Sequence, residues 1–97
     1  MTDNVEVNQL EITKVTDSKG NLIERGGKTS DRTLIVYGKA YRQAEVTIED
    51  DFLFREKVTT DPTGGWGATL KKLPVGERYL EAVVDGKRSQ SWILYIV

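Results

Sequence analysis

Apolar and polar residues alternate along short segments of this chain, and no longer window shows the 3.6-residue period of an amphipathic helix. Turn-forming residues separate the segments at intervals of about 8–12 residues. This pattern predicts an antiparallel β-sandwich of about seven strands, in which two sheets share one core. The expected strands cover residues 9–15, 32–40, 44–49, 52–60, 66–70, 77–85 and 90–97.

The alternation also predicts which side chains face the core. Gly38 and Ala40 are assigned inward, because small residues suit a narrow gap between sheets. The phase is ambiguous at residues 52–54, where a β-bulge would explain the break. Trp92 shares the phase of the inward residues on its strand and is expected to be half-buried near one end. The other expected inward residues are Leu10, Ile12, Leu34, Val36, Val46, Ile48, Trp66, Ala68, Leu70, Leu80, Ala82, Val84, Leu94 and Ile96.

A corner between residues 61 and 76 organises the second half of the chain. It contains an Asp-x-x-Gly-x-Trp motif, Asp61, Gly64 and Trp66, and then a Leu-x-x-Gly motif, Leu73 and Gly76. We expect Asp61 and Gly64 to form a tight turn that delivers Trp66 into the core. Calcium binding at Asp61 is a second interpretation, because carboxylate oxygens are hard ligands. The turn is favoured, since no run of alternating acids accompanies the motif.

The last two predicted strands carry apolar residues on their outward faces. Tyr79 and Val83 point outward on one strand, and Ile93 and Tyr95 on the other. If the strands are neighbours, these side chains form one patch of the kind that marks an interface. Alternatively, the pairs across the strands only stabilise the sheet. Together with Trp92, these four residues are the candidate interaction face.

Length and charge narrow the classes of function. A chain of 97 residues forms one small domain. Fourteen basic and fifteen acidic residues give a net charge of -1, so no nucleic-acid partner is expected. The basic pairs at residues 71–72 and 87–88 are interrupted by turns and are expected to be solvated. The apolar runs are too short to cross a bilayer, so no membrane insertion is expected.

Catalysis is not expected, nor is a cofactor. The chain has no cysteine and no histidine, which excludes disulfides, the usual zinc sites and nucleophilic relays that require either residue. Asp50 and Asp51 are adjacent acids at an expected hairpin tip. Neighbouring residues of a strand point to opposite faces, so these carboxylates do not form a catalytic pair.

Several spaced motifs resemble the bacterial Ig-like repeat domain of large surface and adhesin-like proteins. The most specific is the 61–76 corner, and the likeness covers about residues 10–97. A fibronectin type III module is the neighbouring alternative. The other motifs that carry the likeness are Ile12-x-x-Val15-x-Asp17-Ser18-x-Gly20, Leu34-x-Val36-x-Gly38-x-Ala40, Val46-x-Ile48, Leu80-x-Ala82, Ser89 and Leu94-x-Ile96.

The resemblance implies a Greek-key Ig-like domain at residues 9–97 after a flexible entry at 1–8. It implies a non-catalytic spacer or adhesion module of an extracellular or bacterial cell-surface protein. Its expected partners are neighbouring domains of the same chain and a protein or glycan ligand. The alternative is a carbohydrate-binding or accessory module of a secreted enzyme. Residues 1–4 contain no signal-peptide pattern.

Overall fold

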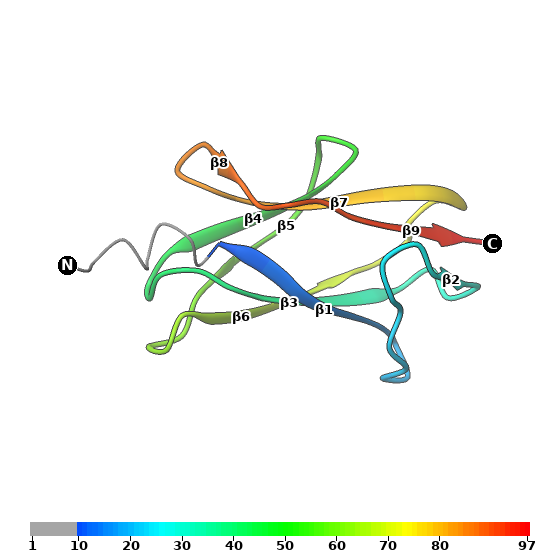
Figure 1. The fold of residues 1–97 in the computed structure, drawn as a ribbon, viewed down its shortest axis with the longest axis horizontal. Coiled ribbons are helices and arrows are strands. Elements are labelled where there is room, and N and C mark those ends of the chain that lie inside the picture. Colours follow the sequence, from blue (N-terminus) through cyan, green and yellow to red (C-terminus); the bar gives the residue numbers. More distant parts are fainter. Residues whose placement is uncertain (1–9) are drawn as a thin grey trace.

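The computed structural model describes residues 10–97, so the entry segment predicted at 1–8 lies outside the described residues. These residues form an all-β fold of nine strands, two of which contain only two residues (Figure 1). The strands are β1 (Glu11–Asp17), β2 (Lys28–Thr29), β3 (Leu34–Lys39), β4 (Glu45–Asp50), β5 (Leu53–Thr59), β6 (Gly65–Leu70), β7 (Gly76–Val84), β8 (Lys87–Arg88) and β9 (Trp92–Ile96).

The strands make two sheets that pack face to face. The smaller sheet has the order β1-β3-β6, and the larger has the order β2-β9-β7-β4-β5, with β8 added beside β7. All pairs are antiparallel except β2 with β9. The prediction of a sandwich with about seven main strands is therefore confirmed. Two-residue strands carry too little pattern to be recognised from sequence, so β2 and β8 were not predicted.

One core lies between the two sheets, and the predicted alternation identifies most of it. The inward sets of β3, β4, β6, β7 and β9 are buried, and Leu10 packs partly buried against them. Burying these apolar side chains supplies the main favourable term of folding. The largest fully buried apolar side chains are Leu34, Ile48, Leu70, Leu73, Leu80, Leu94, Ile96, Val15, Val36 and Val46.

Trp66 lies in this core, and Gly38 makes room for it. The two residues face each other across the β3–β6 ladder. A Cβ atom at position 38 would collide with the Trp66 indole and with the backbone oxygen of Glu11. Gly38 is therefore small because of its neighbour in the same sheet, whereas the sequence argument attributed this to the gap between sheets.

The 61–76 corner joins the two sheets. The Asp61 carboxylate accepts hydrogen bonds from the backbone N–H of Thr63 at 2.8 Å and of Gly65 at 2.9 Å. Together with the Thr63 hydroxyl, which contributes most, these donors lower the pKa of Asp61. Gly64 has a φ of 88°, and a Cβ atom there would collide with the Ala40 oxygen. The carboxylate thus serves the turn.

The second motif of the corner redirects the chain into the larger sheet. The Leu73 side chain is fully buried, and its backbone N–H donates to the Arg32 oxygen at 3.0 Å. Gly76 has a φ of 118° and begins β7. Within residues 10–97, no group of three or more acids, histidines or cysteines is placed to hold a metal ion.

The β4–β5 hairpin differs from its predicted form. Asp50 was assigned to a solvated tip, but its side chain is only 1% exposed. It accepts a hydrogen bond from Arg78 at 2.8 Å and lies 3.6 Å from Arg55. The true tip is formed by Asp51 and Phe52. The register of β4 against β5 shifts between Ile48 and Glu49, so the hairpin contains a bulge, but the extra residue is Arg55 and not one of the predicted residues 52–54.

Candidate interaction face

The strands β7 and β9 are neighbours, as the proposed face requires. They pair antiparallel with Tyr79 opposite Ile93 and Glu77 opposite Tyr95. Tyr79, Ile93 and Val83 are half-buried, and Tyr95 is exposed. Val83 lies further along β7, opposite Thr47 of β4. These four residues therefore share the outer surface of the larger sheet.

Trp92 does not belong to that surface, which corrects the prediction. It has the inward phase of β9 and is 9% exposed. The Arg25 guanidinium lies over its ring, with the carbon 4.3 Å from the ring centroid. This cation–π contact covers the outermost part of the indole. Trp92 is a core residue and offers no flat platform to a ligand.

The hairpin tip adds two aromatic residues that the sequence argument did not assign to the face. Phe52 and Phe54 are 59% and 62% exposed. Phe54 pairs with the outward residue Glu49, which places it on the outer surface. The Phe52 ring lies 5.8 Å from the Tyr79 ring and 5.0 Å from the Arg88 guanidinium carbon. We call Phe52, Phe54, Tyr79, Val83, Ile93 and Tyr95 the aromatic face.

The signal for these residues was visible in the sequence but not decisive. Three consecutive apolar residues, Phe52, Leu53 and Phe54, break the alternation, so no phase could be chosen. The reason is conformational. Asp51 and Phe52 have φ angles of 53° and 68°, which are turn values usually taken by Gly, Asn or Asp. A bulky residue such as Phe is unfavourable there.

A charged network lies among the aromatic residues. Arg88 donates to Glu49 at 2.8 Å and to Glu81 at 2.9 Å. The hydrogen bond to Glu49 is the largest of the effects that raise the pKa of Arg88. On the other side of the face, the Tyr95 hydroxyl donates to Glu77 at 3.5 Å. The surface thus combines aromatic rings with fixed, compensated charges.

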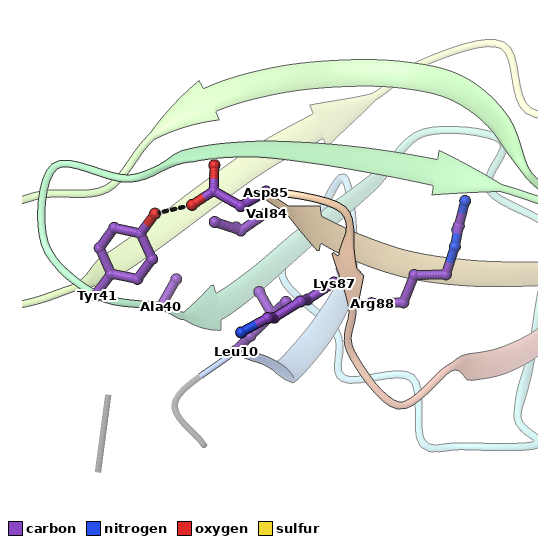
Figure 2. Close-up of a pocket in the computed structure, with 7 residues that line it drawn as sticks. All are labelled: Leu10, Ala40, Tyr41, Val84, Asp85, Lys87 and Arg88. Carbon is purple, nitrogen blue, oxygen red and sulfur yellow. Dashed lines mark hydrogen bonds between the residues drawn. The ribbon is translucent and has the colours of Figure 1, made fainter. Parts of the chain in front are cut away.

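A pocket of about 440 Å³ opens at the end of the sandwich where β1 begins. Its apolar lining comes from Leu10, Ala40 and Val84, and its polar lining from Tyr41, Asp85, Lys87 and Arg88. Figure 2 shows the hydrogen bond that the Tyr41 hydroxyl donates to Asp85. That bond is the main cause of a raised pKa of Tyr41. We call this the end pocket.

The comparisons with known proteins give no functional assignment. No protein-family model, no curated protein and no solved structure matches this chain. Among residues 10–97, the structure contains no helix long and apolar enough to cross a membrane.

Proposed function

We propose that this chain is a non-catalytic Ig-like module of a bacterial cell-surface or secreted adhesin-like protein. The strand order supports the Ig-like part of the proposal. In constant-type Ig domains the first, second and fifth strands share one sheet and the third, sixth and seventh share the other. Counting only the seven longer strands, the sheets here hold the same two sets. The fourth, β5, departs from that pattern, because it joins the sheet of the third, whereas constant-type domains place it in the sheet of the first.

The path of the chain supports a role in a linear array of domains. β1 begins beside the end of β3, where Glu11 pairs with Lys39. β9 ends beside the start of β7, where Ile96 pairs with Gly76. These two points lie at opposite ends of the sandwich (Figure 1). A module entered at one end and left at the other spaces its neighbours apart.

The aromatic face is the single observation that carries an interaction role. A spacer needs no contiguous apolar surface, yet this sheet exposes Phe52, Phe54 and Tyr95 around half-buried Tyr79 and Ile93. Interface cores are enriched in aromatic residues and arginine, with polar groups at the rim. Arg88 and its two glutamates fit such a surface. The partners of the proposed module are a protein or a glycan ligand and neighbouring domains of its own chain.

The surroundings of Asp50 and Asp51 do not suit a pair of catalytic carboxylates. Asp50 is paired with arginines, while Asp51 is exposed at a hairpin tip. Neither sits in an apolar cleft with a partner carboxyl, which is the arrangement that glycoside hydrolysis uses.

Binding through the aromatic face is tested with a face variant and a matched control. The face variant is Ile93→Ala with Tyr95→Ala. The control is Leu22→Ser with Val75→Ser, because these side chains are also exposed, at 69% and 60%, but lie off the face. The probes are a glycan array and immobilised extracellular proteins. We expect the face variant to lose binding at least about tenfold, as interface anchors do, while the control keeps it.

The same experiment separates the two ligand classes. Aromatic rings at the surface favour a carbohydrate-binding role as the second candidate, because sugar rings stack on exposed aromatic faces. Glycan binding that depends on Tyr95 supports that candidate, and protein binding alone supports the adhesion role. If neither ligand class binds, or if both variants bind like the parent chain, the interaction role is wrong and only the spacer role remains.

A further inference from the structure

The tip of the β4–β5 hairpin projects two uncovered apolar side chains. Leu53 and Phe54 are both 62% exposed. The tip is nonetheless held in place, since the Asp51 N–H donates to the Tyr79 oxygen at 2.8 Å. The Phe52 ring adds its contacts with Tyr79 and Arg88. A projecting group fixed in advance loses little conformational freedom on binding, so it is well suited to enter a partner.

The end pocket offers an apolar wall to such a side chain. Its wall of Leu10, Ala40 and Val84 is apolar, and its volume of about 440 Å³ falls in the range of sites that accept a ligand body. It lies at the end of the sandwich where β1 begins, and Arg88 of its lining contacts the Phe52 ring of the tip. Leu53 and Phe54 do not line the pocket of their own molecule.

The hairpin tip and the end pocket also carry residues of opposite charge. Asp51 precedes the apolar residues of the tip, and Lys87 stands at the pocket. Neither forms an ion pair with another residue in the part of the chain that the structure describes. A tip that enters the pocket brings an acid toward Lys87 and Arg88, while Asp85 of the pocket accepts the Tyr41 hydroxyl, and such complementarity fixes the orientation of partners.

We propose that the partner of the end pocket is the β4–β5 hairpin tip of a second copy of this chain. The inference rests on the proposed interaction role and names the partner of that role. The contact is heterologous, because tip and pocket are different surfaces, so a pair of copies keeps one tip and one pocket free. Contacts of this kind extend into open chains unless a rotation closes them. The module would thus adhere to other copies of itself.

Sedimentation of the full chain over a range of concentrations tests the proposal. The tip variant is Leu53→Ser, which leaves every residue of the aromatic face in place, and the matched control is Leu22→Ser, at a residue that is also exposed, 69% against 62%. We expect self-association of the parent chain that the tip variant weakens by at least about tenfold and the control leaves unchanged. Thermal melting checks that all three chains fold, as substitutions at such exposed positions should permit.

A charge exchange tests the geometry of the contact. Asp51→Lys and Lys87→Glu, each alone, should weaken self-association by up to about fivefold, the scale of an exposed ion pair. A mixture of the two variants should recover parental affinity between unlike chains, because each chain then meets an opposite charge. A contact in which position 51 of one copy meets position 87 of another predicts this recovery.

Three results would overturn the inference. The first is a chain that stays monomeric at every concentration. The second is association that the tip variant keeps and the Ile93→Ala, Tyr95→Ala variant loses, which would assign the contact to the aromatic face of both copies. The third is a mixture of charge variants that associates no better than either variant. None of these results bears on ligand binding that depends on Tyr95. The proposed function is therefore tested separately.

Discussion

At the scale of single residues, the core depends on two fitted pairs. Gly38 has no side chain because the Trp66 indole occupies the space that a Cβ atom would take. Asp50 is buried because two arginines compensate its charge, with Arg78 at 2.8 Å as the closer one. In each case the partner explains the property. Trp66 explains why residue 38 has no side chain, and the arginines explain why Asp50 can be buried.

The first pair predicts a large effect of a single methyl group. Gly38→Ala should destabilise the fold by about 2–3 kcal/mol, because the new Cβ atom collides with a packed ring and with the Glu11 oxygen. The matched control is Gly67→Ala, where the nearest atom is 3.4 Å away on Tyr37. Urea unfolding measures both. Equal stability of the two variants would contradict the assigned packing.

The second pair predicts a contrast between two adjacent acids. Asp50→Asn should cost about 2–4 kcal/mol, because it leaves buried arginine groups without their counter-charge. Asp51→Asn should change stability by less than about 0.5 kcal/mol, since the residue is exposed and asparagine accepts a positive φ. Thermal and urea unfolding of both variants check the contrast. It fails if Asp51→Asn is the more damaging change.

At the scale of elements, the β4–β5 hairpin contains an unfavourable backbone conformation. Its turn needs two residues with positive φ, and one of them is Phe52. Natural proteins keep strained backbone positions chiefly where function requires them. The strain at Phe52 and the exposure of Leu53 and Phe54 are therefore features that the proposed contact of the tip would explain.

This explanation predicts opposite effects of one substitution on stability and on contact. Phe52→Asn places a favourable turn residue at a φ of 68°. It should leave the free energy of unfolding unchanged or raise it by up to about 1 kcal/mol, while self-association weakens as the tip loses its ring contacts. Denaturant unfolding and sedimentation of the same sample measure both. A clear loss of stability would mean that the ring chiefly holds the sheet together.

Much of this architecture follows from sequence, and the exceptions have physical causes. Alternation assigned the inward residues of β3, β4, β6 and β7, because strands with one buried face must alternate. Trp92 was predicted to share the inward phase of its strand and was also included in the candidate interaction face. The alternation of residues alone does not reveal that the Arg25 guanidinium lies over its ring. The burial of Asp50 depends on arginines 5 and 28 positions away, and no local pattern reports them. Phe52 was missed because it occupies a conformation that its residue type disfavours.

At the scale of the whole molecule, three carboxylates in turns make the free energy of unfolding depend on pH. Hydrogen bonds lower the pKa values of Asp17, Asp31 and Asp61 from 3.8, with donation by the side chains of Asn21, Ser18 and Thr63 as the main causes. As the pH falls below about 3.8, the unfolded chain takes up protons before the folded chain does. The stabilising effect is complete above that pH and is lost as the pH falls through the folded values.

Urea unfolding at pH 6, 4 and 3 should therefore show a progressive loss of stability on acidification. Asp61→Asn removes one of the three titrating groups and should make the loss smaller, although the variant starts from a lower stability at pH 6. Glu24→Gln is the control, because Glu24 is exposed and forms no ion pair among the described residues. An identical pH dependence for the parent chain and Asp61→Asn would exclude Asp61 as a contributor.

The two-residue strand β2 affects how the domain resists a pulling force on its last strand. It lies parallel to β9, and the N–H groups of Tyr95 and Val97 donate to the oxygens of Gly27 at 2.9 Å and Thr29 at 2.8 Å. A pull on the last strand, away from the end where β1 begins, acts along this ladder and along the ladder with β7. Bonds loaded in shear share the tension and break together, whereas bonds at a peeling edge break one by one. The few hydrogen bonds between β2 and β9 thus help β9 to resist being pulled out of the sheet.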